Sequence, residues 1–262
     1  MNPAQMYDFR TKMGVPEGRE WEPFAGLPPE IETRCREALI SAPWARDTTR
    51  QFEAQRIVVP DRASFPRADD AEISTQAAFG KILNEIARAG GPLADAIVTT
   101  SPDVSVSTNL GGWVNRRGLF GRTADEDVFR KRKIASAQIW TETPAGQHIE
   151  LGIAENNLFL NLAAFGLAEP LFGVRLLPIG TLYDPFIARG LDALNYACYM
   201  DARFILVATP SGVTLGPEGG THQSISSPLI GMGQPGLRSY EPAFADELAV
   251  LLRHAFETMQ DE

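Results

Sequence analysis

Residues 174–208 read VRLLPIGTLYDPFIARGLDALNYACYMDARFILVA, and this stretch decides the fold. The runs VRLLPI (174–179) and FILVA (204–208) are short and apolar, as strands buried on both faces of a sheet are. Between them, residues 185–200 place apolar side chains on one side of a predicted helix. A strand, a helix and a second strand in this order predict two parallel strands joined by a crossover helix.

The same alternation continues on both sides of this stretch. Upstream, Ser74 is a predicted N-cap for a helix that ends at Gly90-Gly91, and AIVTT (96–100) follows as a strand. Residues 156–167 and 243–259 predict two further helices, of which the first is apolar on nearly every side. We therefore predict an α/β fold with a mostly parallel sheet and helices on both faces.

Two regions depart from this pattern. Residues 1–70 contain eight prolines, which discourage a continuous regular element. They are predicted as an extended arm or linker with helical pieces such as 30–41, which leaves residues 71–262 for the domain. Within the domain, the Gly-, Arg- and Asp-rich residues 110–133 are predicted as a long loop, and residues 237–240 could form a short strand.

The composition argues against several classes of protein. The chain has 262 residues, of which 44% are hydrophobic and 22% charged, and a formal net charge of -9. An acidic balance without an extended basic patch argues against a nucleic-acid partner. No apolar run approaches the ~20 residues of a membrane span, and two widely separated cysteines do not suggest a disulfide framework. We expect a cytoplasmic protein with no nucleic-acid or membrane partner.

Several polar residues are predicted to meet at one edge of the sheet. Loops at 101–103, 180–184 and 209–224 follow predicted strands, and parallel strands present their carboxyl ends, where ligands bind, at the same edge. Glu155 opens the apolar helix, so it is expected to be partly removed from water. The alternative role is a first-turn acid that complements the helix dipole, and the residues alone favour that alternative.

His222 lies in the glycine-rich stretch GPEGGTHQS, which follows the last strong strand signal. A histidine there could serve as an acid, a base or a hydrogen-bond donor, or it could cap a surface turn. Glu218, Asp103 and Gln223 are weaker candidates, because residues of these types in loops more often fix the loop itself.

Two aromatic residues and one further polar pair complete the candidates. Tyr183 and Phe186 could stack on a flat heterocycle, although aromatics near the start of a helix more often belong to the core. His148 and Glu150 precede Glu155 closely. Because no second cluster of histidines or carboxylates accompanies them, no metal site built from this chain alone is expected.

Three segments resemble one known group of enzymes. They are GQHIELGIAENNLFLNLAAFGL (146–167), LLPIGTLYDPFIARGLDALNYACYMDARFILVATPSGVTLGPEGGTHQS (176–224) and SYEPAFADELAVLL (239–252). Their order and spacing resemble the pyrimidine-binding domain of thiamine-diphosphate enzymes, most closely that of homodimeric-type pyruvate dehydrogenase E1 and related 2-oxoacid dehydrogenases. The resemblance covers about residues 74–259, and transketolases share the same skeleton.

The resemblance implies catalytic roles for three residues. Glu155 matches the glutamate that hydrogen-bonds N1′ of the cofactor's aminopyrimidine and shifts the ring toward the tautomer that removes the C2 proton. His222 matches a histidine that faces the reacting centre, where it would transfer a proton or stabilise a developing alkoxide. Glu218 matches an acid of the same loop that orients His222 or the substrate.

The resemblance also implies contacts with the cofactor, thiamine diphosphate. Asp103 matches an acid near the cofactor, and either Tyr183 or Phe186 should stack on the aminopyrimidine ring. Gln223 belongs to a loop similar to the family's E-G-x-x-H-Q loop, and it is expected beside the cofactor as well.

One motif of these enzymes does not occur in the chain. They bind the diphosphate and Mg²⁺ through a separate domain that carries a GDG sequence and an Asn ligand, and the chain has no GDG. The Mg²⁺ ligands and the diphosphate contacts are therefore expected from a partner domain or subunit, within a dimer or a hetero-oligomer.

The expected function is that of an E1-type subunit or fragment. It would carry out thiamine-diphosphate-dependent oxidative decarboxylation of pyruvate or a related 2-oxoacid, with acyl transfer to the lipoyl domain of an E2 partner. One alternative is a split transketolase that transfers two-carbon ketol units, with Arg175, Arg189 or Arg203 as contacts for a sugar phosphate. Another is a non-catalytic assembly or regulatory domain, against which the presence of both Glu155 and His222 argues.

Overall fold

Residues 2–42, 52–70, 72–124, 128–136 and 138–261 are described in the computed structural model. Contacts divide the chain into two units, Met1–Phe52 and Glu53–Glu262. The boundary predicted from the sequence between the arm and the domain lies further along the chain, at residue 70. Residues between the two positions belong to the larger unit because Phe65, which is only 4% exposed, packs into its core.

The smaller unit contains α1 (Pro3–Lys12) and α2 (Pro29–Ser41). Each helix begins with a proline. Proline lacks an N–H, and at the first position of a helix the N–H makes no hydrogen bond within the helix. Asn2 caps α1, because its side chain accepts a hydrogen bond from the Gln5 N–H while the Gln5 side chain accepts one from the Asn2 N–H. The predicted helical piece at 30–41 is confirmed as α2, and α1 is an addition to the predicted elements.

Six strands form one sheet in the described part of the chain, in the order β3-β2-β4-β1-β5-β6. Every neighbouring pair is parallel, so the predicted parallel sheet is confirmed. Every residue of the interior strand β5 is buried, as the predicted strand at 174–179 is expected to be, although β5 begins three residues later. The strands are β1 (Ile97–Ser101), β2 (Leu119–Phe120), β3 (Glu142–Thr143), β4 (His148–Glu150), β5 (Leu177–Leu182) and β6 (Ile205–Ala208).

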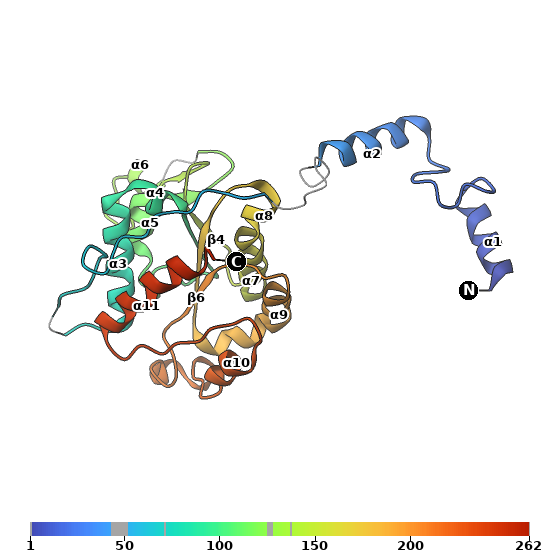
Figure 1. The fold of residues 1–262 in the computed structure, drawn as a ribbon. Coiled ribbons are helices and arrows are strands. Elements are labelled where there is room, and N and C mark those ends of the chain that lie inside the picture. The colour runs from blue at the N-terminus through green and yellow to red at the C-terminus, as the bar shows by residue number, and fades with distance from the viewer. Residues whose placement is uncertain (1, 43–51, 71, 125–127, 137, 262) are drawn as a thin grey trace. The chain divides into compact units, whose positions relative to one another are not determined.

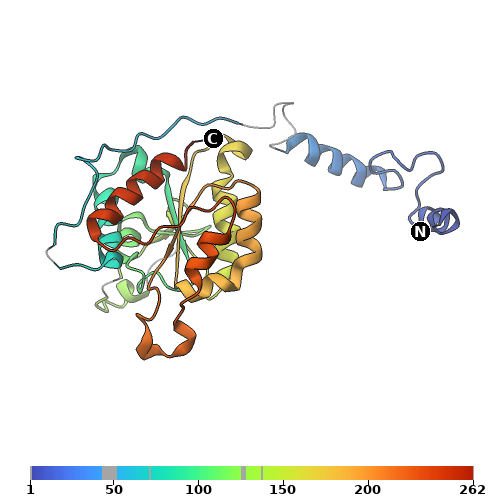
Figure 2. The same cartoon turned by 60° about the horizontal axis from the view of Figure 1, so that its bottom comes forward.

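Helices cover both faces of the sheet, as predicted (Figures 1 and 2). One face carries α3 (Thr75–Ala89), α4 (Gly91–Ala96), α5 (Gly111–Arg117) and α11 (Ala245–Thr258). The other face carries α7 (Glu155–Gly166), η2 (Asp184–Gly190), α9 (Leu191–Tyr199) and α10 (Ser227–Gly233). The remaining helices of the described residues are α6 (Val128–Lys131), α8 (Ala168–Phe172), η3 (Gly216–Glu218) and η4 (Gly220–His222).

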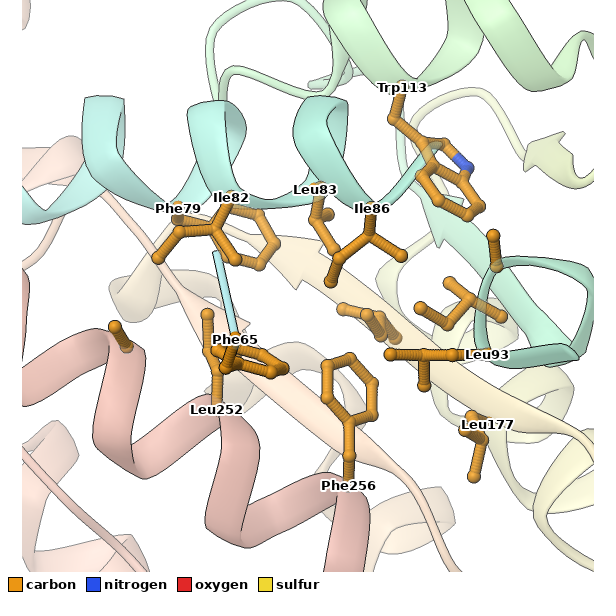
Figure 3. Close-up of a cluster of buried hydrophobic side chains, with 14 of the residues drawn as sticks. Phe65, Phe79, Ile82, Leu83, Ile86, Leu93, Trp113, Leu177, Leu252 and Phe256 are labelled. Carbon is orange, nitrogen blue, oxygen red and sulfur yellow. The ribbon is translucent and has the colours of Figure 1, made fainter. Parts of the chain in front are cut away.

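The core of the first face shows how the segment before the domain is held. Phe65 lies between α3 and α11, beside Ile82 and Phe256 (Figure 3). Burial of a large apolar side chain stabilises the fold by about 1.5–3 kcal/mol. The ends of α3 are those predicted: Ser74 Oγ accepts a hydrogen bond from the Ala77 N–H at 3.1 Å, and Gly90, with a φ of 70°, ends the helix.

Three predicted elements differ from the structure. Residues 110–133 are not one long loop, because they contain α5, whose Trp113 is fully buried, and also β2 and α6. Residues 237–240 form no strand. The predicted helix 185–200 is divided at Gly190 into the 3₁₀ helix η2 and the α-helix α9. Among the described residues, no helix is long and apolar enough to cross a membrane, and the cytoplasmic location stays a prediction.

Candidate active site

The carboxyl ends of β1, β4, β5 and β6 lie at one edge of the sheet, because these strands are parallel. The segments that follow them are residues 102–105, 151–155, 183–190 and 209–226. Each predicted site residue belongs to one of these segments. The fold therefore gathers them at the edge where open α/β sheets bind ligands.

Glu155 is the first residue of α7, and only 7% of it is exposed. Its predicted burial is confirmed. Arg189 Nη1 donates a hydrogen bond to Glu155 Oε1 over 3.2 Å. Gly190 makes this contact possible, because η2 packs so closely on α7 that a Cβ at Gly190 would lie 2.2 Å from Phe159 Cδ2 and 3.2 Å from the Glu155 carbonyl oxygen.

Tyr183, Phe186 and His222 form a group of three rings. The centroids of the two aromatic rings are 6.0 Å apart with an interplanar angle of 27°. The His222 ring meets Phe186 nearly edge-on, at 5.4 Å between centroids and an angle of 68°. Arg189 Cζ lies 4.3 Å from the centroid of Phe186, in a cation–π contact. Arg189 therefore connects the buried carboxylate of Glu155 to the three rings.

His222 lies between a hydroxyl and a carboxylate. Its Nδ1 is 3.1 Å from Thr221 Oγ1, and its Nε2 is 3.7 Å from Glu218 Oε2. The second distance is too long for a hydrogen bond but suits an ion pair when the imidazole is protonated. The His222 side chain is 29% exposed, so solvent reaches its ring.

Asp103 and Gln223 stand apart from this group. Gln223 follows η4 directly, and Asp103 is exposed, with a φ of 64°. The Asp103 N–H donates to Glu150 Oε1 over 2.6 Å, which ties it to a different set of side chains. Within the described residues, no hydrogen bond, ion pair or ring contact joins the side chain of Asp103 or Gln223 to Glu155 or His222.

Comparison with known families decides the assignment. The family described as pyruvate dehydrogenase E1 component middle domain matches residues 63–262, which is most of the chain. The chain belongs to this family. The predicted resemblance to the E1 and transketolase group is thereby confirmed.

Relatives and solved structures agree with this assignment. The pyruvate dehydrogenase E1 component of Corynebacterium glutamicum is 26% identical to this chain over 267 residues, which cover 96% of this chain and 28% of the relative. That of Pseudomonas aeruginosa is 26% identical over 204 residues, which cover 77% and 23%. The chain thus spans about a quarter of the length of these relatives.

Two solved transketolases share the fold. The structures from Campylobacter jejuni and Leishmania mexicana each have a TM-score of 0.58 against this chain, with 18% and 19% sequence identity. Each alignment covers 87% of this chain and 28% of the transketolase chain. At this identity the likeness establishes the fold alone.

Sequence reasoning missed a buried polar network in the middle domain, which we call the His148 network: Thr99, Ser101, Ser105, His148 and Glu150. His148 is fully buried, with Thr99 Oγ1 at 2.8 Å from its Nδ1 and Ser105 Oγ at 2.9 Å from its Nε2. Ser105 Oγ also donates its single proton to a hydrogen bond with Glu150. His148 Nε2–H is therefore the donor to Ser105, and the Thr99 hydroxyl lies at hydrogen-bond distance from Nδ1.

Glu150 fixes the segment that follows β1. Burial alone would raise the pKa of this carboxyl, but contacts with His148, Ser105 and the Asp103 N–H outweigh burial and lower the pKa to about 2. The network depends on the pairing of β4 with β1, in which His148 lies opposite Thr99. Because β4 is only three residues long, its sequence carries too little periodicity to predict this pairing.

The structure also separates the three arginines considered for a sugar phosphate. Arg175 donates to the Ala54 carbonyl oxygen and Arg203 to Asp201, so both have structural partners. Arg189 lies at the site. Among the described residues, no group of three or more His, Cys, Asp or Glu side chains could hold a metal ion.

Proposed function

We propose that this middle domain is the pyrimidine-binding part of a thiamine-diphosphate-dependent 2-oxoacid dehydrogenase. The enzyme would decarboxylate pyruvate or a close relative and pass the acyl group to a lipoyl domain of an E2 partner. The observation that carries the proposal is the buried carboxylate of Glu155 at the ligand edge of the sheet, beside a group of aromatic rings. Membership of the E1 middle-domain family supports it.

The geometry fits an aminopyrimidine ring. The Arg189 guanidinium is flat and bears nitrogen donors, and it both bonds Glu155 and lies on the ring of Phe186. A carboxylate beside an aromatic face would hold an aminopyrimidine by the same two interactions. Because the Arg189 side chain is 54% exposed, it can turn toward solvent when the ring takes its place. Bound thiamine diphosphate would supply the electron sink for decarboxylation.

Each side chain of the group then has a role. Glu155 would hold or release a proton at N1′ of the pyrimidine, and Phe186 or Tyr183 would support the face of the ring. His222 would give or take a proton at Nε2, the nitrogen nearest to Glu218. Glu218 would stabilise the protonated imidazole.

Asp103 and Gln223 would border the cofactor rather than bind its pyrimidine. Asp103 follows β1 and Gln223 follows η4, so both belong to segments at the ligand edge of the sheet. The network around Glu150 holds the Asp103 backbone in place. Both residues would contact the cofactor.

Exposed apolar side chains around the site support a partner domain. Ile153, two residues before Glu155, is 76% exposed. Val213 and Ile225, in the segment that carries His222, are 66% and 90% exposed. Apolar side chains gathered at a site are typical of a surface that another protein covers. We assign the cover to a diphosphate-binding domain or subunit, which would also provide the Mg²⁺ ligands within a dimer or hetero-oligomer.

Transketolase activity is the second candidate, and one observation favours it: Arg189 is a cation at the site with an exposed side chain. A sugar phosphate would need such a contact. The other two arginines considered for this role are held elsewhere by structural partners. The third candidate, a non-catalytic domain, would not explain why Glu155 and His222 both lie at the ligand edge of the sheet.

The test begins with the chain purified together with any polypeptide that binds it, identified by native mass spectrometry. The complex is titrated with thiamine diphosphate and Mg²⁺, and then assayed with pyruvate and an artificial electron acceptor. We compare wild type with Glu155→Ala and with Glu85→Gln, which alters only an exposed ion pair with Arg88.

The proposal predicts cofactor-dependent decarboxylation that Glu155→Ala abolishes and Glu85→Gln leaves intact. Ketol transfer without decarboxylation would replace the proposal by the transketolase alternative. Full activity in Glu155→Ala would overturn the assignment of the site. A complex that binds no cofactor would favour the non-catalytic alternative.

A further inference from the structure

Asp184 contacts both ends of the segment that carries His222. It is the first residue of η2 and is 4% exposed. Its Oδ2 accepts a hydrogen bond from the Gly212 N–H at 3.1 Å, and its N–H donates to the Pro210 carbonyl oxygen at 3.3 Å. Its own carbonyl oxygen accepts a hydrogen bond from Ser227 Oγ at 3.1 Å. One residue therefore holds the chain where it leaves β6 and again where it enters α10.

The two ends are also bonded to each other. The Ser224 N–H donates to the Gly212 carbonyl oxygen at 3.0 Å, and the hydroxyls of Ser224 and Ser227 are 2.7 Å apart. Residues 213–223 thus form a loop with a closed neck, which we call the His222 loop. Gly212 at the neck has a φ of 65°, a conformation that residues other than glycine rarely adopt.

The rings that contact His222 flank Asp184 in the chain. Tyr183 directly precedes Asp184 and Phe186 follows it by two residues, and their ring centroids lie 6.1 Å and 5.4 Å from that of His222. A shift of the neck relative to Asp184 would therefore move His222 relative to both rings. Glu218 would move with it, because it belongs to the same loop.

The chemistry of Asp184 argues against a role as mere core filling. Burial raises the pKa of this carboxyl, the Gly212 N–H opposes that effect, and the nearby charge of Glu241 adds to it. Its second oxygen, Oδ1, is buried without a hydrogen-bond partner in the described residues. A buried polar group in this state is costly, so an apolar side chain would fill the same space at lower cost.

We propose that Asp184 is a positioning residue, which clamps the neck of the His222 loop and so fixes His222 and Glu218 against Tyr183 and Phe186. The catalytic use of the fixed His222 rests on the proposed function. The clamp itself is a property of this chain and can be measured without cofactor, partner or substrate.

The test is hydrogen exchange, measured by mass spectrometry on the full chain. Asp184→Ala removes the acceptor of the Gly212 N–H, whereas Asp184→Asn keeps an amide oxygen that can accept the same bond. Ser227→Ala removes the contact at the other end of the neck and leaves the buried carboxylate in place. Asp192→Asn, an exposed acid on the neighbouring helix α9, is the matched control.

We expect exchange in residues 213–223 to rise about tenfold in Asp184→Ala and severalfold in Ser227→Ala. Exchange in β1 and β5 should stay within about twofold of wild type. Asp184→Asn should restore most of the protection, and Asp192→Asn should change nothing. Protection of the loop that stays at the wild-type level in both Asp184→Ala and Ser227→Ala would overturn the clamp. If Asp184→Ala unfolds the chain, Ser227→Ala alone decides.

Nuclear magnetic resonance of the three histidines supplies the readout for position. The Cε1–H signal of His222, assigned with His222→Gln, should be displaced by the nearby Phe186 ring in the wild type. In Asp184→Ala it should move toward the position of an exposed histidine, and Asp184→Asn should bring it back. An unmoved signal in Asp184→Ala would contradict the positioning role. Failure of cofactor binding would leave both results unchanged, so it tests the proposed function separately.

Discussion

Two histidines, one within the sheet and one beyond its ligand edge, are held in opposite ways. His148, at β4, is fully buried, and each of its ring nitrogens lies within hydrogen-bond distance of a hydroxyl. His222, beyond β6, is 29% exposed and is held by ring contacts, one hydroxyl and a carboxylate at 3.7 Å. The first environment leaves the ring little room to change its direction, whereas the second leaves the ring open to solvent on one side.

The same contrast separates two carboxylates. Glu150 accepts hydrogen bonds from a backbone N–H and from hydroxyls, and its pKa is lowered to about 2. Among the described residues, Glu155 has one hydrogen-bonded partner, Arg189, whose side chain is 54% exposed and can leave. We infer that the His148 network builds the edge of the sheet, while the group around Glu155 and His222 uses that edge for binding and chemistry.

The largest expected effect on stability is at His148. His148→Ala would leave the Thr99 hydroxyl and Ser105 without their buried partner, so the free energy of unfolding should fall by about 3 kcal/mol. Urea unfolding measures it, with His254→Ala on α11 as the control, for which we expect a loss below about 1 kcal/mol. Equal losses in the two variants would show that the network around His148 does not hold the edge.

His222 should show the reverse pattern. In the assembled, cofactor-loaded enzyme, His222→Gln should lower kcat about a hundredfold, as loss of a proton-transferring side chain does. Its free energy of unfolding should change by less than about 1 kcal/mol, since the ring is partly exposed. A kcat within threefold of wild type would remove His222 from the chemistry.

Acid should weaken the His148 network through Glu150. A carboxyl whose pKa is lowered to about 2 in the folded chain contributes stability that is present above its unfolded value near 4.5 and is lost as the pH falls toward 2. We expect Glu150→Gln to cost roughly 2 kcal/mol at pH 7 and progressively less below pH 4. Urea unfolding of both proteins at pH 7, 4 and 3 measures this difference. A gap that stays constant with pH would mean that the carboxylate charge contributes nothing.

Sequence patterns predict the elements that bury a continuous apolar surface. The strand β6 and the helices α7 and α11 lie where residues 204–208, 156–167 and 243–259 place them, and β5 begins three residues after the start of the predicted run 174–179. The burial of Glu155 follows from the same reasoning, because a carboxylate at the start of an apolar helix is carried into the interior with it. The ring contacts of Phe186 with His222 join segments that the alternation of strands already brings to one edge.

Contacts that depend on short strands or on close approach escape sequence reasoning. The partners of His148 require a pairing by the three-residue strand β4. The bond between Arg189 and Glu155 requires the close packing that Gly190 permits, and nothing in the sequence distinguishes that glycine from one in an ordinary turn. The clamp by Asp184 depends on the path of the His222 loop, which has no periodic signal.

The central claim is that Glu155 serves chemistry and Glu150 serves structure, although both are acids on the ligand edge. It is tested most directly by measuring kcat and the free energy of unfolding side by side, for Glu155→Gln and Glu150→Gln in the assembled enzyme. Both changes keep the size of the side chain and remove its charge.

The account predicts opposite results for the two variants. Glu155→Gln should lose at least about a hundredfold in kcat with little change in unfolding. Glu150→Gln should lose roughly 2 kcal/mol of stability and keep kcat within severalfold of wild type. If Glu155→Gln instead lost stability and kept its kcat, Glu155 would be a structural acid at a helix start, and the account would be contradicted.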